Sequence, residues 1–250
     1  MKALITGASS GIGKDLSYIL SNMNCDLILV ARSIDKLEEI KKDIKTNVTL
    51  YQYDLSNIDN CYKLYDKVKN EDIDIIINNA GFGVFGSFDK TNIDRELEMI
   101  NLNIKAVHIL TKLFLKDFKK KNEGYILNVA SSAAFLPGPL MASYYASKAY
   151  VLHLTEALYE ELRRDKSNVY VGILCPGPVD TNFNNVAGVK FGVKAMNSMD
   201  VASYAIKCMF KKKLIIIPGM SIKLIYYFGK ILPLKYLLKV TYNIQKAKEY

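Results

Sequence analysis

Seven short apolar runs recur along the chain, and segments with helical spacing separate them. The runs cover residues 2–6, 26–32, 48–53, 74–78, 124–129, 169–174 and 214–217. Most of them lack polar alternation, which is typical of strands that are buried on both faces of a parallel sheet. We therefore predict an α/β fold with a doubly wound parallel sheet of about seven strands. Helices are expected over 14–23, 34–45, 59–69, 92–121, 143–164 and 200–210.

The domain organisation follows from this pattern and from the length of 250 residues, which is enough for one large core. No internal repeat or low-complexity linker interrupts the alternation. We expect residues 1–220 to form one domain and residues 221–250 to form a basic, apolar helical extension. The extension either belongs to the same domain or lies at an interface.

A glycine-rich turn follows the first predicted strand and opens the first predicted helix. It reads Gly7-Ala8-Ser9-Ser10-Gly11-Ile12-Gly13. Glycines at such a turn let backbone amides approach a pyrophosphate at the amino end of a helix. Ligands of doubly wound sheets bind beyond the carboxyl ends of the strands, so we predict a dinucleotide site there.

A tyrosine and a lysine stand four residues apart near the start of the helix predicted over 143–164. Tyr144 and Lys148 therefore share one face of that helix, and Ser143 is expected to cap its amino end. A lysine cation in that position stabilises a phenolate and lowers the pKa of a tyrosine. The pair predicts a tyrosine that donates a proton near neutral pH.

Four motifs in order carry a resemblance to a known family. The spacing T-G-x-x-x-G-x-G at 6–13, Asn78-Asn79-Ala80-Gly81, Tyr144-x-x-x-Lys148 and Pro176-Gly177 resemble the short-chain dehydrogenase/reductase family, in its one-domain branch of about 250 residues. The resemblance covers residues 2–218. It implies a Rossmann fold and an oxidoreductase that moves a hydride between a nicotinamide and a ketone or secondary alcohol.

The resemblance also implies catalytic residues. They are Asn103, Ser131, Tyr144 and Lys148. Ser131 would hydrogen-bond the carbonyl oxygen, Tyr144 would act as general acid, Lys148 would bind the nicotinamide ribose, and Asn103 would hold a water. Asn101 is the competing register for the asparagine, and Ser132 is the near alternative for the serine. Tyr145 is three residues from Lys148, on a less favourable face.

The implied cofactor residues extend over the ends of six predicted strands. They are Gly7, Ser9, Ser10, Gly11, Ile12, Gly13, Arg32, Ser33, Asp54, Leu55, Asn79, Ala80, Gly81, Tyr144, Lys148, Pro176, Gly177, Val179 and Thr181. NAD-binding members place an acid at the end of the second strand, where this chain has Arg32 and Ser33. A guanidinium beside a hydroxyl suits a 2′-phosphate, so NADP(H) is predicted over NAD(H).

The expected substrate side is apolar. It comprises Phe82, Val84, Phe85 and Phe88, residues 135–141, and a lid over residues 183–199. Such residues form pockets for bulky hydrophobic ketones, 3-oxoacyl or steroid-like, or they pack in the core or at a dimer contact. Relatives pair through the helices around 92–121 and 144–164, which implies a homodimer or homotetramer.

The formal net charge of +9 belongs to the C-terminal segment alone. Residues 207–250 contain ten lysines and one acid, whereas basic and acidic residues balance in the preceding part. Lysines and Pro233 interrupt the apolar stretch, so it is not expected to form a membrane-spanning helix. Residues 221–250 form either two amphipathic helices on an anionic membrane or a cover over the substrate cleft. No nucleic-acid-binding module is present, and nucleic acid is not an expected partner.

Compartment and chemistry follow from the remaining composition. Four separated cysteines and two separated histidines match no metal-ligand spacing, and free thiols indicate a reducing cytoplasm. Because an apolar run that is expected to form a strand begins near Met1, no signal peptide is expected. A catalytically silent NADP(H)-binding sensor is the alternative function. Such proteins usually lose the tyrosine or the lysine, and both are present here.

Overall fold

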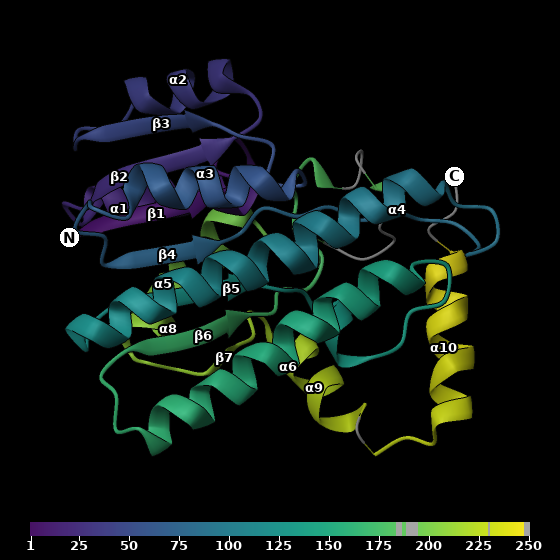
Figure 1. Cartoon of the computed structure of the whole chain (residues 1–250). Coiled ribbons are helices and arrows are strands. Elements are labelled where there is room, and N and C mark those ends of the chain that lie inside the picture. Colours follow the sequence, from purple (N-terminus) through teal and green to yellow (C-terminus); the bar gives the residue numbers. More distant parts are fainter. Residues whose placement is uncertain (184–186, 189–194, 230, 248–250) are drawn as a thin grey trace.

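Seven parallel strands form one sheet in the order β3-β2-β1-β4-β5-β6-β7, which confirms the predicted fold class. This computed structural model describes residues 1–183, 187–188, 195–229 and 231–247 (Figure 1). The strands are β1 (Lys2–Thr6), β2 (Asp26–Ala31), β3 (Val48–Gln52), β4 (Ile75–Asn78), β5 (Tyr125–Val129), β6 (Tyr170–Leu174) and β7 (Ile215–Ile216). Their carboxyl ends meet at one edge, and the strand order reverses between β1 and β4, which is where such sheets bind ligands.

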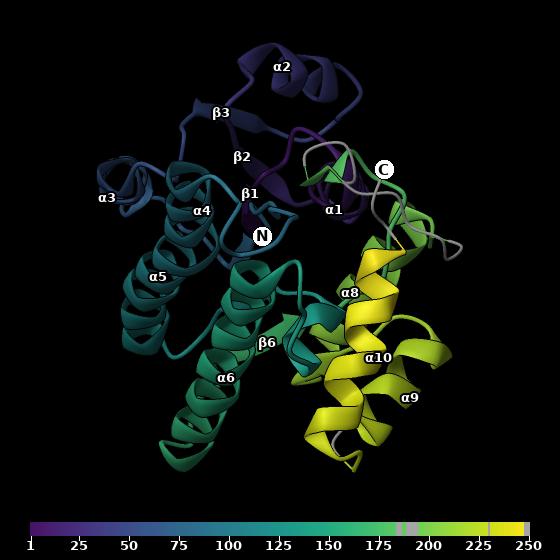
Figure 2. The same cartoon turned by 90° about the vertical axis from the view of Figure 1, so that its right-hand side faces the viewer.

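Helices cover both faces of the sheet, as Figure 2 shows. The first face carries α1 (Gly11–Asn22), α2 (Ile34–Lys42) and α8 (Ser198–Phe210), whose apolar side chains share one core cluster with the strands. The second face carries α3 (Ile58–Val68), α5 (Val107–Lys121) and α6 (Ala142–Arg164) around another cluster. The strands contribute to both clusters, which explains their uninterrupted apolar sequences.

The helix predicted over 92–121 is not continuous. It consists of α4 (Ile93–Ile100), a π-helical turn at Asn101–Ala106, and α5. Asn92 caps α4 by accepting a hydrogen bond from the Arg95 backbone amide at 2.9 Å. A π turn inserts an extra residue into the helix and turns side chains away from their ordinary positions, often at functional sites. Here it directs Asn103 toward the carboxyl edge of the sheet.

The predicted cap of α6 is wrong. The helix begins at Ala142 and is preceded by Met141, so Ser143 lies inside its first turn. Ser143 Oγ donates to the buried carboxylate of Glu96 on α4 at 2.7 Å. A tertiary contact therefore takes the hydroxyl that the sequence pattern assigned to a local cap.

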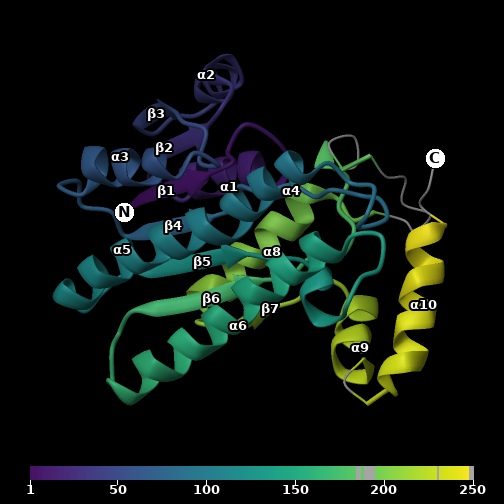
Figure 3. The ribbon, with the colours of Figure 1, turned by 45° about the vertical axis from the view of Figure 1, so that its right-hand side comes forward.

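The C-terminal segment forms α9 (Met220–Phe228) and α10 (Leu234–Lys246), the two helices expected there. Figure 3 shows both beside the edge where the parallel strands end. Within the part of the chain that the structure describes, no helix combines the length and the apolarity that crossing a bilayer requires.

A buried polar network connects the centre of the sheet with α5 and α6. The Asn128 amide accepts from Asn78 Nδ2 at 2.8 Å and from Thr111 Oγ1 at 3.2 Å, and it donates to Thr155 Oγ1 at 3.0 Å. All four residues are at most 2% exposed. Buried networks of this kind favour one packing arrangement, although Asn78 Oδ1 has no partner among the described residues.

We expect Asn128→Ala to lower the free energy of unfolding by about 3 kcal/mol, because its neighbours lose their buried partners and a small cavity forms. Urea unfolding measures the change, with the exposed Asn70→Ala as the matched control. A loss below about 1 kcal/mol, the usual net worth of one hydrogen bond, would contradict the structural role of the network.

Candidate active site

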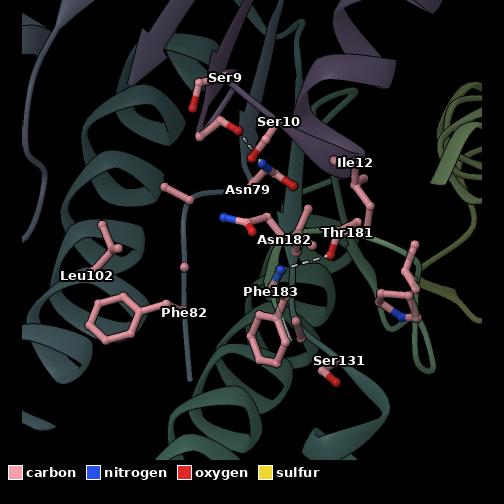
Figure 4. A pocket seen from close by; sticks show the side chains of 18 of the residues that line it. Ser9, Ser10, Ile12, Asn79, Phe82, Leu102, Ser131, Thr181, Asn182 and Phe183 are labelled. Atoms are coloured by element: carbon pink, nitrogen blue, oxygen red, sulfur yellow. Dashed lines mark hydrogen bonds between the residues drawn. The ribbon is translucent and has the colours of Figure 1, made fainter. Parts of the chain in front are cut away.

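One cleft lies at the carboxyl edge of the sheet and has a volume of about 390 Å³. It contains every sequence-predicted cofactor residue except Gly13, together with Ser131. Figure 4 shows Ser9, Ser10 and Asn79 toward one end, Ser131 toward the other, and Phe82 and Phe183 between them. Residues from the ends of six strands, β1 to β6, thus meet in one continuous space.

The glycine-rich turn is built for close backbone approach. Gly7 and Gly11 have φ values of +65° and +52°, a region that residues with side chains rarely adopt. A Cβ on Gly13 would lie 2.5 Å from the Asn79 side-chain nitrogen and against the Gly7 carbonyl oxygen. Gly13 therefore supports the turn from behind, which explains why it does not line the cleft.

The amino end of α1 suits an anion. Ser10 stands at the cap position without a side-chain capping bond, and the first turn of α1 carries no acidic residue. The first amides of a helix and its dipole favour negative charge. The turn and this helix end together fit the pyrophosphate of a dinucleotide.

Asn79 holds the glycine turn against β4. Its side-chain amide donates to the carbonyl oxygens of Thr6 at 3.0 Å and Gly7 at 3.1 Å. Its backbone amide donates to Thr6 Oγ1 at 3.0 Å, and the Ala80 amide does so at 3.1 Å. These contacts connect the loops after β1 and β4 on either side of the point where the strand order reverses.

Arg32 lies at the end of β2 with an exposed guanidinium. Its Nη1 is 3.3 Å from Glu98 Oε1 and 3.9 Å from Asp54 Oδ2. Glu98 also accepts from Arg95. Lys36 lines the same end of the cleft, although the sequence interpretation did not include it. A lysine one turn into the helix after β2, four residues from Arg32, was the available signal.

The buried pair Tyr144 and Lys148 lies at the other end of the cleft, on α6. Lys148 Nζ donates to the Val129 carbonyl oxygen at 3.1 Å and lies 5.9 Å from the centre of the Tyr144 ring. Ser131 precedes the 3₁₀ turn η2 (Ser132–Phe135), and its Oγ accepts from the Ala133 amide at 3.2 Å. Ser131 also hydrogen-bonds Tyr144. Ser132, the alternative serine, lines the cleft as well.

Burial dominates the protonation of this pair. It raises the pKa of Tyr144, while the hydrogen bond with Ser131 acts in the opposite direction. Burial also lowers the pKa of Lys148 to about 8. The expectation that Lys148 sets the Tyr144 pKa is therefore corrected, because removal from water acts more strongly on both charged forms. Tyr144 is protonated near neutral pH and can donate its proton.

Asn103 lies behind the cleft and is fully buried. Its Nδ2 donates to the Phe82 carbonyl oxygen at 2.9 Å and to Ser147 Oγ at 3.1 Å, and its Oδ1 accepts from the Phe82 amide at 3.2 Å. These bonds join the loop after β4 to the turn of α6 beside Lys148. Asn101, the competing register, is only half-buried and does not line the cleft.

Tyr145 also lines the cleft but belongs to a different set of contacts. Gln245 on α10 donates to its hydroxyl. Burial raises the pKa of Tyr145 to about 12, and the bond with Gln245 acts in the opposite direction. The two adjacent tyrosines thus face different partners, Ser131 for the first and the C-terminal helix for the second.

The apolar residues expected at the substrate are only partly brought together. Phe82, Met141 and Phe183 line the cleft, and the Tyr144 and Phe183 rings lie 5.4 Å apart. The expectation that Phe88 flanks the substrate is wrong, because its side chain is 71% exposed and does not line the cleft. Phe135 packs against Tyr226 of α9 instead. Of the lid expected over 183–199, residues 184–186 and 189–194 lie outside the described residues.

A Rossmann fold whose dinucleotide cleft ends at a buried tyrosine and lysine defines a class of nicotinamide-dependent oxidoreductase. The family model described as short chain dehydrogenase matches residues 1–189, and the chain belongs to this family. It is an oxidoreductase of CH–OH and C=O groups.

Similar proteins include two relatives and one solved structure. Human 17-beta-hydroxysteroid dehydrogenase type 3 is 34% identical over 185 residues, which are 72% of this chain and 59% of the human protein. An uncharacterised oxidoreductase of Staphylococcus epidermidis is 34% identical over 212 residues, which are 82% of this chain and 90% of that protein. A short-chain dehydrogenase from Sphingobium yanoikuyae in complex with NADPH has 27% identity, a TM-score of 0.84 and 92% coverage of both chains.

Proposed function

We propose that the protein is an NADPH-dependent carbonyl reductase that transfers a hydride between the nicotinamide and a hydrophobic ketone or secondary alcohol. One observation carries this proposal: a single cleft joins Arg32 and Lys36 to the buried group of Ser131, Tyr144 and Lys148. The first pair supplies charge for a phosphate, and the second group supplies a proton donor for a carbonyl oxygen.

The preference for NADP(H) rests on charge at the end of β2. Arg32 and Lys36 face the cleft, and Ser33 occupies the position next to Arg32. A 2′-phosphate would receive charge-assisted hydrogen bonds from the guanidinium, whereas an unmodified ribose would gain little. The similar Sphingobium structure holds NADPH, which is in keeping with this preference.

The residues present define a mechanism. When bound, the cofactor supplies the hydride. Ser131 donates a hydrogen bond to the carbonyl oxygen as negative charge develops there. The Tyr144 hydroxyl gives its proton to that oxygen, and Lys148 stabilises the resulting phenolate. Lys148 would also hold the ribose hydroxyls of the bound cofactor. Asn103 supports the water that returns the proton.

The substrate class follows from the apolar part of the cleft. Phe82, Met141 and Phe183 surround the space beside Tyr144, and a Cβ on Gly83 would lie 2.9 Å from Phe183. Such a lining favours a bulky apolar ketone, 3-oxoacyl or steroid-like, over a small polar one. The name of the human relative, a hydroxysteroid dehydrogenase, supports the same class. The intact Ser131, Tyr144 and Lys148 favour an enzyme over a catalytically silent sensor.

Calorimetric titration with NADPH and with NADH, followed by a panel of aliphatic, aromatic, 3-oxoacyl and steroid ketones, tests the proposal. We expect tighter binding of NADPH and its oxidation by at least one hydrophobic ketone. Binding without turnover of any ketone in the panel would support the sensor instead.

We also propose that the protein pairs through α4, α5 and α6 as a homodimer or homotetramer. Apolar side chains on these helices are exposed, among them Ile93, Leu97 and Tyr150. His108 Nδ1 lies 2.7 Å from the Tyr150 hydroxyl and joins α5 to α6 at this surface. Sedimentation velocity on the full chain distinguishes the assembly from a monomer.

We place the protein in the cytoplasm. Its four cysteines are free and buried, in keeping with a reducing compartment. Fractionation of cells that express the tagged chain tests this location.

A further inference from the structure

The last two helices present an apolar surface that nothing in the described chain covers. We call it the C-terminal apolar face, and it contains large side chains that are at least 40% exposed. They are Met220, Leu224, Ile225, Tyr227, Phe228, Ile231, Leu232, Leu234, Tyr236, Tyr242 and Ile244. No residue of α9 is buried, although most of its side chains are apolar. Met220, Leu224, Tyr227 and Phe228 share one side of α9 by helical spacing, whereas Tyr242 and Ile244 flank the outward lysines of α10. Exposed apolar side chains gathered in this way mark an interaction surface.

The opposite side of the helix pair is anchored to the fold. Ile222 on α9 packs against Gly177, where a Cβ would lie 2.8 Å from the Ile222 side chain. The centres of the Tyr226 and Phe135 rings lie 4.7 Å apart. Leu237, Thr241 and Gln245, on one face of α10, are buried. The inner contacts therefore hold the pair against the cleft and leave the C-terminal apolar face exposed. Figures 1 and 3 show the two helices beside the strand ends.

Lysines border this face, and acids do not. Lys235, Lys239 and Lys246 are exposed on α10, and Lys223 is partly exposed on α9. The sequence contains no aspartate or glutamate between Lys207 and Lys248. The surface thus combines exposed aromatic and aliphatic side chains with one sign of charge.

The charge distinguishes between possible occupants. A symmetric contact with a second copy would bring two positively charged patches together, because such an interface uses the same patch twice. An anionic bilayer instead supplies negative charge for the lysines and an apolar interior for Phe228 and Ile231. The tyrosines suit the boundary between these layers, because each combines an apolar ring with a polar hydroxyl.

We propose that the C-terminal apolar face docks on the surface of an anionic lipid bilayer, with α9 and α10 lying at the interface. This inference is independent of the proposed reaction, because it rests on residues outside the Ser131, Tyr144 and Lys148 group. Docking places the cleft beside the bilayer, since Ile222 contacts Gly177 and Gln245 contacts Tyr145. An apolar substrate dissolved in the membrane then has a short path to the cleft.

Co-sedimentation of the full chain with phosphatidylcholine vesicles, with and without phosphatidylserine, tests the proposal. The first variant, Phe228→Ser with Ile231→Ser, removes the apolar contact, and Phe88→Ser with Tyr62→Ser is its control at exposed positions elsewhere. The second variant, Lys235→Gln with Lys239→Gln, removes two charges. Lys41→Gln with Lys42→Gln on α2 is its matched control.

We expect binding to phosphatidylserine vesicles that weakens with salt. The apolar variant loses at least about tenfold in vesicle partitioning, and the lysine variant loses about 30-fold. Both controls bind like the original chain. Absence of binding, or equal binding by the apolar variant, overturns the proposal. Sedimentation velocity without vesicles gives a further check: an assembly that dissociates in the apolar variant, without vesicle binding, assigns the face to a second copy.

Discussion

Tyr144→Phe will reduce the turnover of ketone by at least about 1000-fold, within the range that general acids contribute. The variant keeps the ring in its buried position and removes only the hydroxyl that hydrogen-bonds Ser131. Its affinity for NADPH is expected to stay within about fivefold, because the glycine turn, Arg32 and Lys148 remain. A loss confined to kcat identifies a group that acts in the transition state.

The adjacent residue provides the matched control. Tyr145→Phe makes the same chemical change one position along α6, in a side chain that also lines the cleft. Its hydroxyl contacts Gln245 instead of Ser131. We therefore expect kcat to stay within about fivefold of the original and any larger effect of the substitution to be on KM. Steady-state kinetics with one ketone measures both variants. Equal losses in both would assign the effect to packing and would remove Tyr144 from its catalytic role.

Arg32→Asp is expected to change the ratio of NADPH to NADH preference by roughly 100-fold to 1000-fold, since a charged hydrogen bond is lost and a repulsive carboxylate is gained. The new carboxylate repels a 2′-phosphate and can accept a bond from a 2′-hydroxyl. The measurement is kcat/KM for each cofactor with one ketone. Lys41→Asp on the exposed side of α2 makes the same reversal of charge and is the control.

Glu98 provides a second test of the contact between Arg32 and the 2′-phosphate. Its carboxylate contacts Arg32 at 3.3 Å and therefore competes with a phosphate for the guanidinium. We expect Glu98→Gln to strengthen NADPH binding severalfold and to leave NADH binding nearly unchanged. If Arg32→Asp and Glu98→Gln change the two cofactors equally, Arg32 has no specific contact with the 2′-phosphate.

Local patterns predicted the sheet, and they indicated the glycine turn that lines the cleft. The apolar runs indicated the strands because each is buried on both faces, and the glycine turn was recognisable because its function needs backbone approach without side chains. Gly7 and Gly11 have the positive φ values that such a turn requires. These features depend on residues that are neighbours in sequence.

Contacts between segments that are distant in the sequence could not be predicted from local patterns. The sequence gives no sign that Glu98 reaches Arg32 or that Glu96 takes the hydroxyl of Ser143, because each pair joins separate elements. The π turn around Asn103 is a one-residue change in helix winding that apolar periodicity does not reveal. The pKa expectation for Tyr144 was wrong because spacing on a helix does not report burial.

Transfer of deuterium from NADPH labelled at both C4 positions is the most direct test of the central claim. The full chain is incubated with the labelled cofactor and the hydrophobic ketones of the panel, and the products are analysed by mass spectrometry. We expect deuterium on the carbinol carbon of at least one product with the original chain and with Tyr145→Phe, and none above background with Tyr144→Phe. Tight binding of NADPH with no labelled alcohol from any ketone would contradict the reductase.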